Sequence, residues 1–211
     1  MQVCLQGEIL ELLPEKALWL PEYRMLVLAD LHIGKITHFR KAGIYMPPIN
    51  SQPDLLLLQQ LVDRYKPESL TFLGDLFHSQ ANSEWLHLKE FLAFNQSLNV
   101  MLIRGNHDIL PDHYFSQSHI DVLDELQVGN LLLTHQPISN PGQSLLNIAG
   151  HIHPGYLLQV PGRQYYKLSC FYWQEQTFLL PAFGRYTGLY LLKKDTNSKI
   201  YVIAGEKVLA V

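Results

Sequence analysis

Side chains that can bind metal ions gather in five short clusters of the sequence. The clusters are Asp30-Leu31-His32, Gly74-Asp75, Gly105-Asn106-His107-Asp108, His135 and Gly150-His151-Ile152-His153. Seven of these side chains offer two carboxylates, one amide oxygen and four imidazoles: Asp30, Asp75, Asn106, His32, His135, His151 and His153. This mixture of oxygen and nitrogen suits manganese, iron, zinc or cobalt better than calcium or magnesium, which prefer shells made of oxygen alone.

The size of this ligand set indicates more than one ion. Seven ligands are too many for a single catalytic ion, because such an ion keeps one position open for water or substrate. The number fits two divalent ions that share a bridging carboxylate. We expect manganese in both positions, with iron, zinc or cobalt as the alternatives.

Each cluster alone also has a purely structural explanation. Asp30-Leu31-His32 could form a turn or a helix cap, and Gly74-Asp75 could be an ordinary turn from a strand into a loop. His135 could be a hydrogen-bonded histidine of the core. The complete set favours metal binding over these alternatives, because five such clusters in order are not expected from packing alone.

The elements that would position the clusters are short apolar runs, one before each cluster. They span residues 25–29, 70–73, 100–103, 131–134 and 145–149, and each has the length and composition of a buried strand. In open α/β sheets the carboxyl ends of the strands converge on one crevice, where ligands bind. We therefore expect the five clusters to share one rim.

Spacing within the clusters supports this arrangement. Asp30 with His32, and His151 with His153, are separated by two positions and would point to the same side if the backbone stayed extended. A glycine precedes Asp75, Asn106 and His151, which suits sharp turns or a close approach of two backbones.

The rest of the chain predicts an α/β domain with more than one sheet. Residues 53–65 and 83–97 have the apolar spacing and flanking residues of helices. After about residue 119 the sequence consists of short strand-like segments, including 120–127, separated by Gly, Pro and Asn. No repeat, charge block or linker divides the chain, so we expect a single domain over residues 1–211.

Composition indicates a globular protein and excludes several other classes. The 211 residues are 47% apolar and 17% charged, which excludes a disordered or collagen-like chain. The net charge of −3 gives no global electrostatic case for binding nucleic acid. Cys4 and Cys170 are expected to be reduced thiols, and neither a signal peptide nor an apolar run of membrane-spanning length is visible, so we expect a cytoplasmic protein.

Taken in order, the five clusters resemble the motif set of the calcineurin-like metallophosphoesterases. The resemblance covers residues 30–153 and implies a four-layer α/β/β/α sandwich of two mixed β-sheets flanked by helices. It also implies that one ion is bound by Asp30, His32, Asp75 and His153 and the other by Asp75, Asn106, His135 and His151, with Asp75 as the bridge.

The same resemblance implies hydrolysis of phosphate esters. Two divalent ions about 3.5–4 Å apart can clamp a phosphate and lower the pKa of bound water. We expect a metal-bridging hydroxide to attack the phosphorus in line. His107, the family's histidine beside the scissile phosphate, would stabilise the transition state or protonate the leaving oxygen, and Asp108 is a candidate to orient His107.

A narrower resemblance covers most of the chain. Residues 28–35, 39–43, 74–79 and 181–184 are similar to the ligase-associated DNA-damage-response endonucleases of the PdeM type. This similarity implies a DNA endonuclease in bacterial DNA repair, with a DNA ligase, a helicase and an exonuclease as partners. The alternatives are a hydrolase of a small phosphoester such as a nucleotide, and a non-catalytic scaffold of the same fold.

Candidate substrate contacts are basic residues near the clusters: Lys35, His38, Arg40, Lys41, His78, Arg104 and Arg185. The first four follow the first ligands and could extend a positive field along a nucleic-acid backbone, or form the solvated face of a helix. His78 could reach the substrate or belong to a turn. Arg104 and Arg185 could contact phosphate or be ordinary surface arginines.

Overall fold

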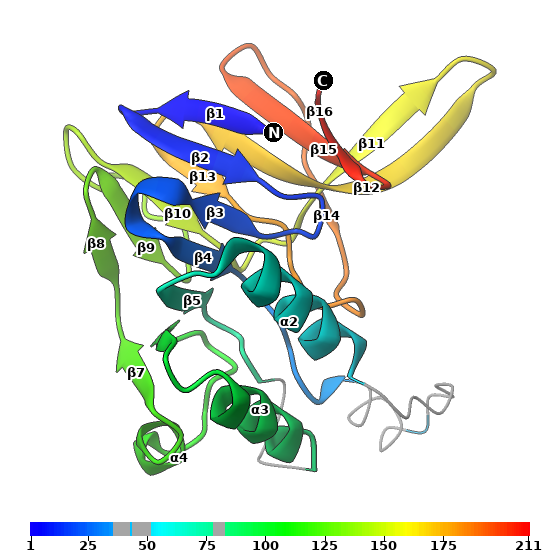
Figure 1. Ribbon diagram of the computed structural model, residues 1–211. Helices are drawn as coiled ribbons and strands as arrows, with labels where there is room; N and C mark the ends of the chain where they lie inside the picture. The colour runs from blue at the N-terminus through cyan, green and yellow to red at the C-terminus, as the bar shows by residue number, and fades with distance from the viewer. Residues whose placement is uncertain (36–42, 44–51, 78–82) are drawn as a thin grey trace.

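The first of two mixed β-sheets carries the helices of the protein. The computed structural model describes residues 1–35, 43, 52–77 and 83–211 (Figure 1). The first sheet has the strand order β1-β2-β3-β4-β5-β6-β7, antiparallel from β1 to β4 and parallel from β4 to β7. Its strands are β1 (Gln2–Leu5), β2 (Glu8–Leu12), β3 (Leu18–Leu20), β4 (Met25–Leu28), β5 (Ser69–Leu73), β6 (Asn99–Ile103) and β7 (Ile120–Leu123).

The second sheet has the order β14-β11-β12-β13-β10-β9-β8, and β15 pairs with both β12 and β16. Strands β9, β10 and β13 are parallel neighbours, whereas β11, β12, β15 and β16 form antiparallel pairs. The strands are β8 (Leu126–Val128), β9 (Leu131–Thr134), β10 (Leu146–Ala149), β11 (Pro154–Val160), β12 (Gln164–Gln174), β13 (Thr177–Leu179), β14 (Tyr190–Leu191), β15 (Ser198–Ala204) and β16 (Lys207–Ala210).

Helices α2 (Pro53–Tyr65), α3 (Ser83–Phe94) and α4 (Asp112–Ser116) share a hydrophobic cluster with the first sheet, and a 3₁₀ turn, η1 (Pro21–Tyr23), joins β3 to β4. α2 begins with proline, whose fixed φ suits the first turn, and buries Leu55, Leu58 and Leu61 along one face. The two longer helices match their predicted positions, although α3 ends at Phe94 rather than near residue 97.

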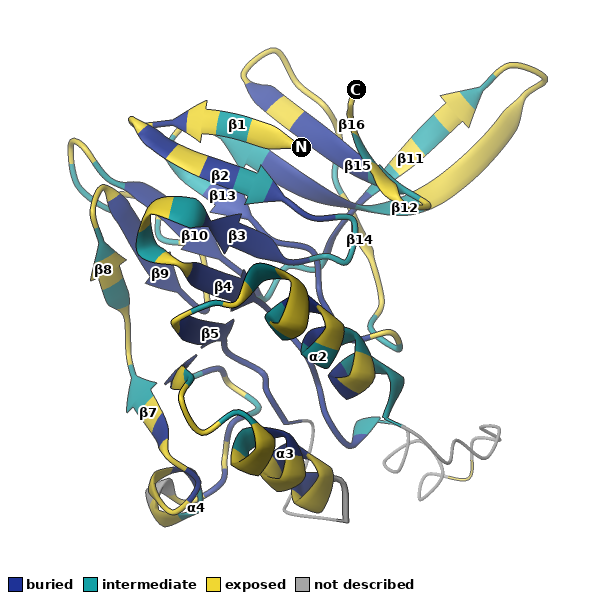
Figure 2. Cartoon of the chain, viewed as in Figure 1, coloured by how far each residue is buried: buried dark blue, intermediate teal, exposed yellow. Residues whose placement is uncertain are grey.

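The main core lies between the two sheets. Side chains alternate along β4, so that Leu26 and Leu28 face the helices while Val27 joins Ile148 and Phe171 of the second sheet. Figure 2 shows the resulting pattern, with β3, β4 and β5 dark blue and the outer faces of α2 and α3 largely yellow. Burial of both faces explains why the central strands β4 and β9 are almost continuously apolar.

A smaller apolar cluster covers the outer face of the second sheet. It contains Cys170 and Tyr172 of β12 and Val202 of β15, with Leu192 and Val211 packed against it. The predicted fold of two mixed sheets with helices is confirmed. In the described residues the helices pack on the first sheet, and loop and terminal side chains rather than a helix cover this face of the second.

One predicted strand is divided between the sheets. Residues 120–127 were expected as a single segment, but β7 pairs with β6 in the first sheet and β8 pairs with β9 in the second. The chain therefore crosses from one sheet to the other at residues 124–125, as Figure 1 shows on the side of β7 and β8. Among the described helices, none is both long and apolar enough to cross a lipid bilayer.

Candidate metal centre

The five clusters meet at one edge of the molecule, as the strand-end rule predicts. Backbone hydrogen bonds join the loops: the Asp30 N–H donates to the Gly74 carbonyl, the His32 N–H to the Asp75 carbonyl and the Gly150 N–H to the His135 carbonyl. Asp30, Asp75 and Asn106 follow strands of the first sheet, and the histidines at 135, 151 and 153 follow strands of the second. Both sheets therefore contribute to the site.

Six of the seven predicted ligands form two compact groups. One group contains Asp30, His32 and His153, and the other contains Asp75, His135 and His151; within each group the ligand atoms lie within 4.8 Å of one another. The seventh, Asn106, places its side-chain oxygen 3.0 Å from His135 Nε2. The geometry therefore provides two places where a cation could bind.

Asp75 lies between the two groups. Its Oδ2 is 3.6 Å from His32 Nε2 in the first group, and its Oδ1 is 3.5 Å from His135 Nε2 in the second. The carboxylate is 3% exposed, so its two oxygens face opposite groups inside the protein. This is the arrangement required of a carboxylate that bridges two ions.

Several buried polar atoms at the site lack a hydrogen-bond partner and could instead bind a cation. Among the described residues, Asp30 Oδ1 and His153 Nε2 are buried without a hydrogen-bond partner, although they lie 3.4 Å apart. His135 Nδ1 lies 2.9 Å from the Leu73 carbonyl oxygen, to which it must donate, so its Nε2 carries the free lone pair and faces the site. Buried polar groups without partners are rare, and a divalent ion would satisfy these.

Burial favours the neutral form of another histidine of the site. Burial lowers the pKa of His151, and the neighbouring His135 lowers it further. The carboxylates of Asp30 and Asp75 raise this pKa, but by less. The neutral imidazole is the form that binds metals. The backbone N–H of His151 also donates to Asp30 Oδ2 at 2.9 Å, which ties the two ligand loops together.

The backbone at the ligands is not extended, contrary to the expectation from the two-residue spacing. The φ values are 54° for Asp30, 50° for His32, 49° for Asp75, 66° for His151 and 53° for His153. These left-handed conformations are unfavourable for residues with a side chain and persist only where the surroundings impose them. The paired ligands therefore reach the site through tight left-handed turns, not through strand alternation.

Two glycines allow the loops to approach one another. Gly74 has a φ of 73°, and a methyl group there would overlap the imidazole of His135. A methyl group on Gly105 would overlap the backbone nitrogen and the carboxylate of Asp75. The predicted close approach at the glycines before Asp75 and Asn106 is therefore present, and only glycine fits at these positions.

Asp108 connects the loops that carry the ligands. Its Oδ2 accepts a hydrogen bond from the Gly105 N–H at 2.9 Å, and its Oδ1 accepts one from the Phe77 N–H at 3.2 Å. Burial raises its pKa to about 6, although the two donors oppose the shift. These contacts make Asp108 a positioning residue for the loops after β5 and β6.

His107 stands beside the first group of ligands. Its backbone N–H donates to Asp75 Oδ1 at 2.9 Å, and the centre of its ring lies 5.5 Å from that of His32. The side chain is therefore close enough to the candidate metals to meet a group bound there.

The structure describes some of the candidate substrate contacts and not others. Burial lowers the pKa of Lys35, while Asp30 and Asp75 raise it, so this half-buried ammonium lies within the field of the site. The guanidinium of Arg104 donates to the Asp108 carbonyl at 3.3 Å. His38, Arg40, Lys41 and His78 lie outside the described residues.

Sequence reasoning missed a segment that borders the site. The Gly184 N–H donates to the Asp30 carbonyl at 3.2 Å, and the Tyr190 N–H donates to the His153 carbonyl at 2.9 Å. The similarity at residues 181–184 and the candidate phosphate contact Arg185 pointed to this region, but neither carried geometric information.

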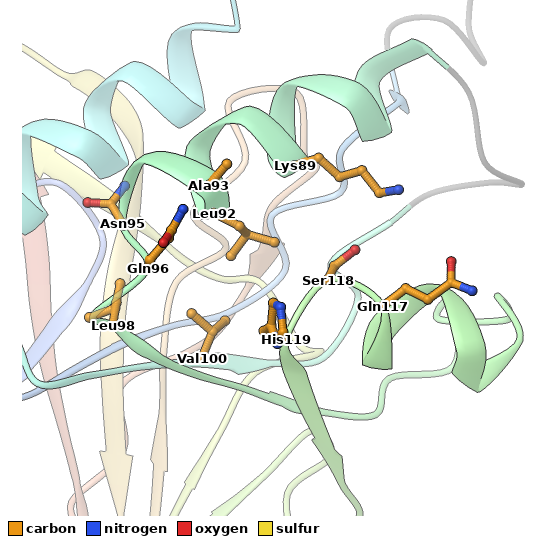
Figure 3. Close-up of a pocket in the computed structure, with 10 residues that line it drawn as sticks. All are labelled: Lys89, Leu92, Ala93, Asn95, Gln96, Leu98, Val100, Gln117, Ser118 and His119. Carbon is orange, nitrogen blue, oxygen red and sulfur yellow. The ribbon is translucent and has the colours of Figure 1, made fainter.

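A cavity beside α3 lies away from the metal centre. It has a volume of about 580 Å³ and is lined by residues of α3, by the segment after α3 and by residues 117–119. Figure 3 shows Lys89, Leu92 and His119 among its walls. No candidate ligand belongs to the described lining of this cavity.

Comparison with known proteins identifies the family to which this site belongs. The family model of the calcineurin-like phosphoesterases matches residues 23–206. The chain belongs to the calcineurin-like phosphoesterase family. This phosphoesterase is metal-dependent, in agreement with the two ligand groups that its strand ends bring together.

Solved structures extend the comparison. The phosphoesterase is 31% identical to Pseudomonas putida nuclease MPE, with a TM-score of 0.83 over 100% of this chain and 99% of that one. The phosphoesterase Yfce from E. coli is 14% identical, with a TM-score of 0.47 over 89% and 97% of the two chains. No functionally curated protein gives a significant match.

Proposed function

We propose that the chain is a two-metal phosphodiesterase that cleaves DNA. The observation that carries the proposal is the position of Asp75, whose two oxygens face two separate groups of ligands. The similarity over the full length to Pseudomonas putida nuclease MPE supports a nuclease rather than another phosphoesterase.

In this proposal the two ligand groups hold the ions. Asp30, His32, Asp75 and His153 would hold one, and Asp75, Asn106, His135 and His151 the other. Two bound ions, for which manganese is our first choice, would activate a water molecule for in-line attack and neutralise the charge of the phosphate. Asp75 is the least replaceable ligand, because its loss weakens both positions.

His107 is proposed to act on the substrate. The hydrogen bond from its backbone to Asp75 fixes it relative to the metals, and its ring lies next to that of His32. Here the imidazole would stabilise the transition state or give a proton to the leaving oxygen. Such a group contributes about 10²–10⁴ in rate.

The biological setting is proposed from the sequence resemblance. The similarity to ligase-associated endonucleases of the PdeM type supports a role in bacterial DNA repair in the cytoplasm, beside a DNA ligase, a helicase and an exonuclease. Lys35, Arg104 and, outside the described residues, Arg40 and His78 are proposed substrate contacts.

Hydrolysis by purified protein tests the function. Single-stranded DNA, duplex DNA, bis(p-nitrophenyl) phosphate and p-nitrophenyl phosphate are offered with manganese to wild type, Asp75→Asn and His107→Ala, and to Asp121→Asn as an exposed control. We expect wild type and the control to cleave DNA, Asp75→Asn to lose metal and activity, and His107→Ala to keep its metals with about 10²–10⁴ lower turnover. Preference for the monoester over every diester would refute the proposal.

A further inference from the structure

Residues 156–168, which we call the arm, extend beyond the rest of the second sheet. They form the outer part of the hairpin between β11 and β12, which projects from the body of the protein in Figure 1. In the described residues, β14 is the only strand besides β12 that pairs with β11, and it does so at Pro154 and Gly155 alone. The outer edge of β11 is therefore open from Tyr156 to Val160.

The backbone of β11 offers hydrogen-bonding groups along this open edge. The Leu192 N–H donates to the Gly155 carbonyl on the side of β14, and hydrogen-bonding directions alternate along a strand. The next residues that point to this side are therefore Leu157 and Gln159. Among the described residues, no strand pairs with their N–H and carbonyl groups.

No charged side chain protects this edge. β11 has the sequence PGYLLQV, seven residues without an acidic or basic side chain. The strands at the other sheet edges, β1, β7, β8, β14 and β16, have four residues or fewer. Proteins normally block a long open edge with charges, bulges or a covering segment, and a two-stranded hairpin is only marginally stable by itself. The arm therefore needs a further strand beside it.

Exposed apolar side chains gather around the same edge. Leu158 belongs to none of the hydrophobic clusters of the described residues, and it lies opposite Tyr166, which is 50% exposed. Apolar patches of this kind are typical of protein–protein interfaces. Six of the thirteen large apolar side chains that are exposed in the described residues lie on β11, on β12 or at β14: Leu157, Tyr165, Tyr166, Leu189, Tyr190 and Leu191.

A second copy of β11 fits this edge when the two strands run antiparallel about a two-fold axis at Leu158. In this register Leu157 and the partner's Gln159 exchange both backbone hydrogen bonds, and the symmetric pair does the same, so all four free groups of each copy are satisfied. An axis at Leu157 would set Gln159 against Gly155, which β14 covers. An axis at Gln159 would set Leu157 against Pro161, which has no N–H.

The side chains also match in this register. Leu158 faces its own copy, and Tyr156 faces the partner's Val160 on the same face of the joined sheet. Beside them, Tyr166 extends this apolar face onto β12. The charge of Lys167 lies opposite Leu157 and meets no charge of its own sign.

We propose that the arm is the interface through which two copies of this chain form a dimer. The joined sheet has the order β12-β11-β11-β12 across the two-fold axis. β11 begins at the residue after the ligand His153, so the pairing also fixes how the two metal centres of the dimer are oriented. Such a dimer goes beyond the proposed nuclease function and does not depend on it.

Measurements of molar mass test the dimer. Sedimentation equilibrium of the full chain, from low micromolar to near-millimolar concentration, should give twice the chain mass of 24.3 kDa. Leu158→Lys sets two like charges against each other and should raise the dissociation constant about 100-fold, since both copies lose a leucine from the interface. Leu209→Lys, at a position 46% exposed on β16, is the matched control and should remain a dimer.

A mixture of charge variants tests the register. Leu158→Lys and Leu158→Glu should each be monomers, whereas their equimolar mixture should form a heterodimer at low salt, because a two-fold axis at this residue places the opposite charges together. Mixing would not rescue a variant that had failed to fold. In a Cys4→Ser background, Leu158→Cys should form an intermolecular disulfide on oxidation, and Leu157→Cys should not, since its own copy lies beyond the Cα separation of about 7 Å that a disulfide can bridge.

The outcomes separate the dimer from the proposed function. A wild type that stays monomeric over the whole concentration range would refute the dimer, and so would a dimer that Leu158→Lys weakens no more than Leu209→Lys does. A mixture of the two charge variants that remains monomeric would refute the two-fold pairing at Leu158. A dimer without hydrolytic activity would overturn the proposed function and leave this interface standing, and DNA cleavage by a monomer would do the reverse.

Discussion

Asp108 is a buried acid whose two oxygens each accept a backbone hydrogen bond, one from the loop after β5 and one from the loop after β6. At 2% exposure it is deep enough for burial to raise its pKa from 3.8 to about 6. The folded state therefore binds a proton at Asp108 more tightly than the unfolded state does.

This shift predicts a pH-dependent difference between wild type and Asp108→Asn. Between about pH 4 and pH 6 the folded wild type holds more protons than the unfolded chain, so its unfolding free energy falls as pH rises. The variant cannot ionise there, and the other groups cancel in the comparison. We expect the stability of wild type relative to the variant to fall by up to about 3 kcal/mol across this range.

Urea denaturation in EDTA at pH 4.5, 5.5 and 6.5 measures the difference without interference from bound metal. Asp121→Asn is the exposed control and should show no such trend. A stability difference that is constant with pH would contradict the raised pKa of Asp108.

The two cysteines should react very differently with a thiol reagent. Cys170 is buried in the outer cluster of the second sheet, and burial raises the pKa of its thiol to about 12, whereas Cys4 is exposed. Because the thiolate is the reactive form, a disulfide reagent at pH 8 should label one thiol in the native protein and two in urea. Labelling of Cys170 at the rate of Cys4 under native conditions would show that the cluster opens readily.

At the scale of elements, the loops after the strands decide how the ligands meet. Apolar runs and the strand-end rule were enough to predict which side chains converge. The left-handed backbone at Asp30, His32 and Asp75 could not be predicted, because few residues other than glycine adopt it, even of these types, and the folded surroundings impose it here.

Other features escaped prediction for similar reasons. The division of residues 120–127 between two sheets depends on which strand each half pairs with, and a short apolar run carries no information about its partner. Residues 184–190 were anticipated only through Arg185, because their placement beside the site comes from backbone hydrogen bonds to Asp30 and His153, which leave no pattern in the side chains.

The role of the turn at Gly74 can be tested against a matched glycine. Gly74→Ala and Gly205→Ala both put a side chain at positive φ, which costs about 1–2 kcal/mol. Nothing lies within 4 Å of a methyl group at Gly205, whereas one at Gly74 meets the His135 imidazole. We therefore expect Gly74→Ala to lose more stability than Gly205→Ala and, in addition, to bind manganese more weakly.

Unfolding in EDTA and a metal titration separate the two effects of the Gly74 substitution. Equal losses of stability in both variants, with unchanged metal affinity, would mean that the turn tolerates displacement of His135. A crystal structure of Gly74→Ala should show the imidazole turned away from Asp75.

At the scale of the whole molecule, the metal centre joins the two sheets. Asp30, Asp75 and Asn106 come from the first sheet and the histidines at 135, 151 and 153 from the second, while the shared core lies between them. In the metal-free protein the left-handed turns and the buried polar atoms without partners act against folding. Bound ions would offset these costs in both sheets at once.

Metal removal should therefore destabilise the entire chain rather than one part of it. A site filled at a metal concentration 100-fold above its Kd adds about 2.7 kcal/mol, which for a chain of this size corresponds to about 5–10 °C in Tm. Scanning calorimetry with manganese and with EDTA should give one transition in each case, shifted by that amount, because we predict a single domain. Asp75→Asn should lose most of the shift, since both ligand groups share this carboxylate. Two separate transitions in EDTA would instead show that the sheets fold independently and that only the metals hold them together.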